Sequence, residues 1–215
     1  MPKADPIRVV YVTSSQHKVN ENEILRTQAR LRDGTPVSAR FEFIIQSISI
    51  KEVLDVDIAS MVIAEVADAY SQLKVPCIVE HAGLIFSEYS SYPGGLTKPM
   101  WNELGAVFVE ETRSANRPAV ARAVVAYCDG MTTQTFVGET AGTIAPAPRG
   151  SREFYWDTVF IPDGQDAGAR RTYAEIVDDL GLDDKVLHFS QSTKAMLGFL
   201  EYRLGHDPVL WRTAA

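Results

Sequence analysis

The sequence predicts one α/β domain, residues 1–215, built on a mixed β-sheet. Strand-like and helix-like segments alternate through the first third of the chain, which is typical of parallel strands joined by helices. A hairpin signal, Asp129-Gly130, then lies between two strand-like runs and adds antiparallel pairs to that sheet. The length of 215 residues suits one domain, or one domain with a small lobe.

Each early element follows from its residue pattern. Residues 7–12 form an apolar run that predicts a buried strand, and the polar residues 13–17 predict a loop. A helix is expected from about residue 18 or 20 to residue 31, because apolar residues recur on one face, and turn-forming residues at 33–36 end it. Residues 41–46 alternate enough to predict the second strand.

A longer helix is predicted over residues 57–73, because apolar residues recur there at helical spacing. They are Ile58, Met61, Val62, Ala64, Val66 and Ala69. The next strand is expected to be short, 77–79, with Glu80 and His81 at its end. The remaining expected elements are, in chain order, a loop at 90–95, hairpin strands at 119–127 and 132–137, and helices at 172–180 and 193–202.

Composition and charge exclude several classes of protein. No apolar run approaches the roughly 20 residues that span a bilayer. The first residues lack an apolar signal core, so we expect a cytoplasmic protein with no membrane partner. The net charge of −7 argues against binding DNA or RNA polymers, although a small anion needs only a local cluster of Lys and backbone N–H groups. Cys77 and Cys128 lie in apolar runs, which predicts buried free thiols.

The most informative segment covers residues 147–164 and reads APRGSREFYWDTVFIPDG. Its Pro-Arg-Gly start and Pro-Asp-Gly end predict turns, which places three consecutive aromatic residues at a loop–strand edge. Aromatic rings beside Arg and Asp can stack on a flat ring and hydrogen-bond its edge. Taken alone, the pattern fits a buried loop core as well as it fits a base pocket.

The spelling of this segment resembles the PRG-x-x-x-FGWD-x-x-F-x-P-x-G signature of the inosine triphosphate pyrophosphatase family, with Tyr155 where the family usually has Gly. The resemblance implies an elongated two-lobed fold, with a central mixed sheet flanked by helices and a nucleotide cleft between the lobes. It implies hydrolysis of a nucleoside triphosphate to monophosphate and pyrophosphate, with Mg²⁺ or Mn²⁺, by a homodimer. It also implies that Phe154, Tyr155 and Trp156 line the base pocket and that Asp157 bonds the base edge.

Residues 13–18, Thr-Ser-Ser-Gln-His-Lys, lie between the first strand and the first helix. Hydroxyl groups and exposed N–H groups at a helix N-terminus can bind an anion, but taken alone the segment favours a simple helix cap. It resembles the family's T-G-N-x-x-K motif, which implies that Thr13, Ser14, Ser15 and Lys18 bind the triphosphate. Lys98 follows a Pro-Gly-Gly turn and resembles the Lys or Arg that contacts phosphate in the family.

Two further motifs concern the metal and the water. The acids around Glu52 are typical of a solvated surface, but the resemblance implies that Glu52 binds Mg²⁺ with help from Glu80. The family reads V-E-D-S/T-G-L where this chain has His81 in place of Asp. A lone His at a strand end is usually structural, yet an imidazole can accept a proton near neutral pH. We therefore expect His81, Glu80 and Lys18 to be the catalytic residues.

The segment 187–197 resembles the family's S-H-R-x-R-A-L motif at the start of the last helix. Ser190 is kept, whereas Gln191 and Ser192 replace the His and Arg that read a 6-oxo purine in the family. Gln offers a donor and an acceptor but Arg offers donors only, so altered base selectivity is expected. Lys185 lies close to a family Lys in sequence and is expected in the same pocket.

The leading hypothesis is a metal-dependent nucleotide pyrophosphohydrolase, and two alternatives stay open. Carboxylates near a ribose can support N-glycosidic cleavage of a nucleotide, which would release free base. A non-catalytic nucleotide-binding relative would also explain the departures from the family motifs. These departures are at Ser15, His81, Gln191 and Ser192.

Overall fold

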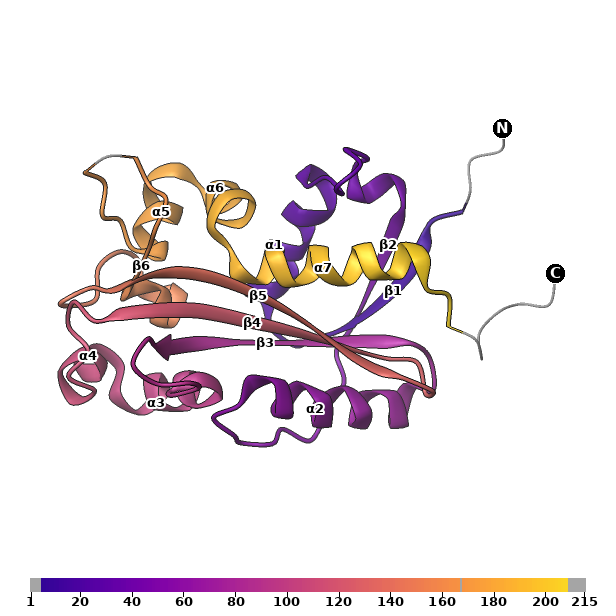
Figure 1. Ribbon diagram of the computed structural model, residues 1–215, viewed down its shortest axis with the longest axis horizontal. Coiled ribbons are helices and arrows are strands. Elements are labelled where there is room, and N and C mark those ends of the chain that lie inside the picture. Colours follow the sequence, from indigo (N-terminus) through magenta and orange to yellow (C-terminus); the bar gives the residue numbers. More distant parts are fainter. Residues whose placement is uncertain (1–4, 167, 209–215) are drawn as a thin grey trace.

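The computed structural model describes residues 5–166 and 168–208, with side-chain positions for all of these except 152–154. Figure 1 shows an elongated molecule in which long strands run along the middle and helices cover both sides. The strands form a six-stranded sheet in the order β2-β1-β3-β4-β5-β6. Their bounds are β1 (Ile7–Val12), β2 (Phe41–Gln46), β3 (Cys77–Phe86), β4 (Pro118–Cys128), β5 (Thr133–Ile144) and β6 (Phe160–Pro162).

The sheet is mixed, as the sequence predicts. β1 pairs in parallel with β2 and β3, while β3–β4, β4–β5 and β5–β6 are antiparallel. The α-helices are α1 (Gln16–Gln28), α2 (Ile58–Leu73), α3 (Thr97–Leu104), α4 (Phe108–Glu111), α5 (Tyr173–Leu180), α6 (Leu182–Asp184) and α7 (Gln191–Gly205). Short 3-10 turns are η1 (Val37–Ala39), η2 (Gly94–Leu96), η3 (Gly105–Val107) and η4 (Arg152–Thr158), and η5 (Lys185–Phe189) is π-helical.

The strand order places a switch point at the carboxyl end of β1. The chain leaves β1 through α1 to reach β2 on one side, then crosses through α2 to β3 on the other side. Connections that diverge in this way leave a crevice at the ends of parallel strands, where ligands bind in open α/β sheets. β1 pairs with only Cys77 and Ile78 of β3, so the rest of β3 extends past the end of β1.

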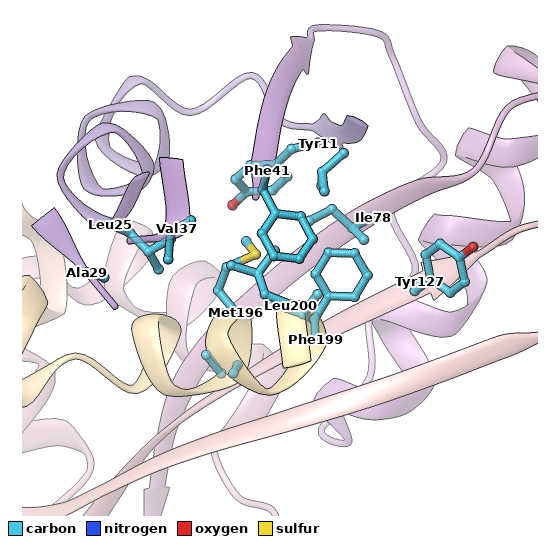
Figure 2. Close-up of a cluster of buried hydrophobic side chains, with 14 of the residues drawn as sticks. Tyr11, Leu25, Ala29, Val37, Phe41, Ile78, Tyr127, Met196, Phe199 and Leu200 are labelled. Carbon is cyan, nitrogen blue, oxygen red and sulfur yellow. The ribbon is translucent and has the colours of Figure 1, made fainter. Parts of the chain in front are cut away.

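Two ends of the molecule have separate apolar cores. Around β1, one buried cluster packs α1, α7 and β2 on one face of the sheet, and a second packs α2 on the other face. Figure 2 shows side chains of β2, β3 and α7 gathered in the first cluster. A third cluster fills the far end, under α4, α5 and β6. Ile78 and Val79 belong to the near cores, whereas Leu84 and Phe86 belong to the far core, so Glu80 and His81 lie where the two lobes meet.

The structure corrects several expected bounds. β3 continues to Phe86 because it pairs with β4 along its whole length, so Glu80 and His81 lie inside a strand and not at its end. α1 starts at Gln16 and ends at Gln28, earlier than expected at both ends. The short helix α4 was absent from the prediction. Along the described residues, none of the helices has the length and apolar character needed to cross a bilayer.

Candidate functional site

Hydroxyl groups of the loop after β1 accept hydrogen bonds from its own backbone and from the first turn of α1. Ser15 is the N-cap of α1 and its side chain accepts a hydrogen bond from the Lys18 backbone N–H at 3.5 Å. The Ser15 backbone N–H donates to Thr13 Oγ1 at 3.1 Å, and Ser14 is exposed. The capping interpretation is therefore confirmed. It leaves the positive end of the helix dipole facing the switch point, where an anion is favoured.

Lys18 reaches from the first turn of α1 to Glu80 of β3. Its Nζ lies 2.9 Å from Glu80 Oε2 and also donates to the Glu80 backbone carbonyl. Tyr11 Oη donates to the same Oε2 at 3.1 Å, and Ser192 Oγ donates to Oε1 at 3.0 Å. Burial favours the neutral acid, but the Lys18 charge and these hydrogen bonds hold the pKa of Glu80 below its ordinary value. Glu80 is therefore a buried carboxylate whose two oxygens are both bonded.

His81 points to the opposite face of the sheet, because successive side chains of a strand alternate. There its Nδ1 lies 3.9 Å from Oε1 of Glu65, a residue of α2 that is 3% exposed. Burial and the Lys18 and Lys98 charges lower the pKa of His81 to about 4, while Glu80 opposes them. Burial raises the pKa of Glu65 to about 7, although Lys18 opposes it. His81 is thus a neutral imidazole at neutral pH.

Glu52 and Lys98 lie at the edge of this cluster. Glu52 is exposed in the loop between β2 and α2, and its charge helps to raise the pKa of Glu65. Lys98 is exposed on the first turn of α3, and its charge acts on both Glu65 and His81. Within the described part of the chain, no three His, Cys, Asp or Glu side chains converge as a preformed metal site.

A second ionic cluster forms around Lys185. Lys185 Nζ is 2.5 Å from Asp157 Oδ2 and 2.8 Å from Glu21 Oε1, and its side chain is only 6% exposed. Burial disfavours the ammonium, but the two carboxylates outweigh burial and raise the pKa of Lys185. Lys185 also lies over the ring of Tyr173, 5.2 Å from its centre. Asp157 was expected to bond the edge of the base, and Lys185 was expected in the same pocket. In the structure these two residues form an ion pair with each other.

The aromatic segment forms η4, a 3-10 turn that leads into β6. Trp156 packs into the far core, with its ring 6.4 Å from both Phe160 and Tyr173. Tyr155 is 47% exposed, and its ring makes a T-shaped contact with His17, with 5.9 Å between the ring centres. The Phe154 side chain lies outside the described part of the structure. Of the described aromatic residues here, only Tyr155 presents its ring at the surface.

Tyr155 has φ of 51°, in the left-handed region that side chains with a Cβ avoid. The resembling signature has Gly at this position, and Gly adopts such a φ without strain. The backbone conformation of this turn therefore favours Gly at position 155. In this chain Tyr155 adopts the same conformation at an energetic cost and adds a ring to the turn.

The start of α7 contributes side chains in two directions. Ser190 is the N-cap and accepts from the Thr193 N–H at 3.3 Å. Gln191 is buried, and its Oε1 accepts a hydrogen bond from Tyr173 Oη at 3.0 Å. Ser192 instead bonds Glu80. Gln191 thus lies beside the Lys185 cluster, whereas Ser192 belongs to the Lys18 cluster.

Three partners of these residues were missed by the sequence analysis: the buried Tyr11 and Glu65 and the partly buried Glu21. Glu65 had a detectable signal, because it occupies the buried face of α2 in register with Met61, Val62 and Ala69. An acid at such a position is costly to bury unless it has a partner. Ala64, expected on that face, is only partly buried. Tyr11 and Glu21 show no such signal, because their roles depend on contacts far along the chain.

Comparison with known proteins shows the family of this chain. The family model described as Ham1 family matches residues 9–198. The chain belongs to the Ham1 family. A relative from Hyperthermus butylicus, named dITP/XTP pyrophosphatase, is 30% identical over 78% of this chain and 82% of its own length. The inosine triphosphate pyrophosphatase of Kluyveromyces lactis is 28% identical over 83% and 88%.

Another relative, named dITP/XTP pyrophosphatase, comes from Methanopyrus kandleri and is 35% identical over 59% of this chain. The match covers 64% of that relative, which is less than two thirds of its length. Among solved structures, a Ham1 protein from Coxiella burnetii has a TM-score of 0.61 at 19% identity, covering 91% of this chain and 99% of its own. The Ham1 protein from Staphylococcus aureus has a TM-score of 0.59 at 18% identity, covering 92% and 100%. These structures confirm the Ham1 fold.

Proposed function

We propose that this Ham1-family chain hydrolyses a nucleoside triphosphate to a nucleoside monophosphate and pyrophosphate. The observation that carries the proposal is the Lys18–Glu80 pair at the switch point, beside the N-terminus of α1, where the helix dipole favours an anion. Relatives named as dITP/XTP and inosine triphosphate pyrophosphatases support it. The cytoplasmic location and the homodimer stay predictions, and light scattering tests the second.

In this proposal the phosphate chain binds between the lobes. The backbone N–H group of Ser14 and the ammonium of Lys18 bind phosphate oxygens from the β1 side, while the Thr13 and Ser15 N–H groups keep their bonds to the Gln46 carbonyl and to Thr13 Oγ1. Lys98 approaches from the far lobe, where it is exposed to solvent. Because Glu80 holds Lys18 in place before the substrate arrives, little conformational entropy is lost on binding.

The residues present can bind Mg²⁺ or Mn²⁺ only together with the substrate, whose phosphates would supply further ligands. Such ions on phosphate chains use one or two carboxylates, with phosphates and water as the other ligands. Glu52 has an exposed carboxylate, and Glu80 supports the site from behind because both its oxygens are bonded already. When bound, the ion neutralises phosphate charge during the displacement.

His81 activates the water in this proposal. It carries no proton on one ring nitrogen at neutral pH and lies on β3 between the lobes. As the water oxygen bonds the α-phosphorus, the water proton passes to the imidazole. The bond from the α-phosphorus to the bridging oxygen breaks, and pyrophosphate leaves with that electron pair. Lys18 and Lys98 bind the negative charge that pyrophosphate carries away.

Base selection is assigned to the Lys185 cluster and Gln191. Tyr173 Oη uses one lone pair of Gln191 Oε1, so the amide N–H groups and the second lone pair of Gln191 remain the hydrogen-bonding groups for a base. Asp157 and Lys185 are buried together, so a base reaches them only after this cluster opens. We propose that these residues give a base selectivity different from that of relatives with His and Arg here, with Tyr155 stacking at the entrance.

A chromatographic product assay tests the proposal. The assay compares three proteins: the wild type, His81→Ala and the matched control His206→Ala, whose histidine is exposed at the C-terminal end of α7. Each protein is incubated with ITP, XTP, dITP and the four standard triphosphates in the presence of Mg²⁺ or Mn²⁺. We expect monophosphate and pyrophosphate from the wild type and control but not from His81→Ala. Free base would show N-glycosidic cleavage instead. Binding without turnover of any nucleotide would favour a non-catalytic relative.

A further inference from the structure

Glu65 is an acid in an apolar position with an unused oxygen. It lies on the buried face of α2, next to Val62 and Val66, and its residue exposure is 3%. Its Oε1 is buried and accepts no hydrogen bond from any described residue. A buried carboxylate oxygen without a donor costs stability, so a position of this kind is a candidate for function.

The group that faces this oxygen is the imidazole of His81. Its Nδ1 lies 3.9 Å from Glu65 Oε1, within ion-pair range and slightly beyond a hydrogen bond. Hydrogen bonds of catalytic groups are often long before substrate binds and shorten in the complex. The two residues come from elements packed directly on one another, α2 and β3, so neither backbone has to move for the contact to close.

We propose that Glu65 is a positioning residue for His81: its carboxylate accepts a hydrogen bond from His81 Nδ1–H and leaves Nε2 as the acceptor for the water proton. This inference rests on the proposed function. The tautomer of a histidine is set by the hydrogen bond of its other nitrogen. A fixed tautomer keeps the basic nitrogen of His81 available throughout the reaction.

The test compares Glu65→Leu, Glu65→Gln and the matched control Glu42→Gln, an exposed glutamate on edge strand β2. We expect Glu65→Leu to lower kcat by about 10-fold or more, with KM changed less than about 3-fold, because proton transfer and not phosphate binding is impaired. Glu65→Gln keeps an acceptor oxygen and should retain more kcat. In a His81→Ala background, Glu65→Leu should have no further effect on kcat.

Two readouts separate this role from a structural one. Glu65→Leu should leave Tm unchanged or higher, since leucine suits the apolar surroundings of this α2 position and removes a buried acid from them. Nitrogen-15 NMR of the imidazole should show His81 as the Nδ1–H tautomer in the wild type and a mixture in Glu65→Leu. An unchanged tautomer, or additive losses of kcat with His81→Ala, would overturn the inference. If the wild type hydrolyses no triphosphate but the tautomer still changes, the proposed reaction fails while the positioning contact stands.

Discussion

Lys18 and Glu80 form a largely buried ion pair between α1 and β3, with 2.9 Å between Nζ and Oε2. The Lys18 side chain is 28% exposed and the Glu80 side chain 3%. The same ammonium also bonds the Glu80 backbone carbonyl on the part of β3 that extends past β1. The pair therefore joins the candidate phosphate loop to the strand that carries His81.

Replacing Lys18 by Met should impair folding as well as turnover. It leaves the Glu80 carboxylate buried without its cation, which costs about 3 kcal/mol of unfolding free energy. The double variant with Glu80→Gln should regain most of that stability but no activity, because the phosphate ligand is still missing. Urea denaturation measures the first effect, and the matched control Arg26→Met, on the exposed side of α1, should change stability by less than about 0.5 kcal/mol.

Lys185 should be more important for stability than a surface lysine. Lys185→Met leaves the carboxylates of Asp157 and Glu21 together without their cation, so we expect a loss of about 3–5 kcal/mol in urea denaturation. Arg8→Met, which removes a cation from an exposed pair on the sheet edge, is the control. A loss below about 1 kcal/mol for Lys185→Met would show that the cluster is already solvated in solution.

Tyr155 tests the backbone strain in η4. Tyr155→Gly and Tyr155→Ala both remove the ring and its contact with His17, but only Gly suits a φ of 51°. We expect Tyr155→Gly to be more stable than Tyr155→Ala by about 1 kcal/mol, measured as a difference in urea midpoint at constant m-value. Equal stability of the two variants would mean that the left-handed conformation is not kept in solution.

Asp129 should make stability depend on pH in the acid range. Burial raises its pKa, but hydrogen bonds from the Thr132 and Met131 N–H groups outweigh burial and lower it. The folded pKa lies below the unfolded one, so the contribution is complete above the unfolded pKa and is lost as pH falls through the folded pKa. Asp129→Ala should therefore cost about 1–3 kcal/mol at neutral pH and much less in strong acid. A pH-independent difference would contradict this.

The mixed sheet and the candidate loop could be predicted from the sequence, because local patterns indicate strands and turns. Apolar runs predicted β1 and β4, alternation predicted β2, and Asp129-Gly130 predicted the turn before β5. The strand order depends on long-range pairing and was not predicted. The full length of β3 could not be predicted, since its polar centre is stabilised by pairing with β4, a long-range contact. Both cysteines are buried free thiols, as predicted, and burial raises the pKa of Cys77 to about 12.

The candidate site was only partly predictable for the same reason. The resemblance pointed to Lys18, Glu80 and His81; the structure pairs Lys18 with Glu80 and places His81 next along β3, facing the other side of the sheet. The partner of His81 lies on a different helix, and no motif joins Glu65 to it. The separation of Ser192 from Gln191 follows from their directions on α7, which sequence similarity does not give.

The most direct test of the central claim is the position of bond cleavage. Wild-type protein would hydrolyse ITP and ATP with Mg²⁺ in water enriched in oxygen-18, followed by phosphorus-31 NMR. Our account predicts monophosphate that carries the label and pyrophosphate that does not, because water attacks the α-phosphorus. Inorganic phosphate with a nucleoside diphosphate, or free base with an intact triphosphate chain, would contradict it.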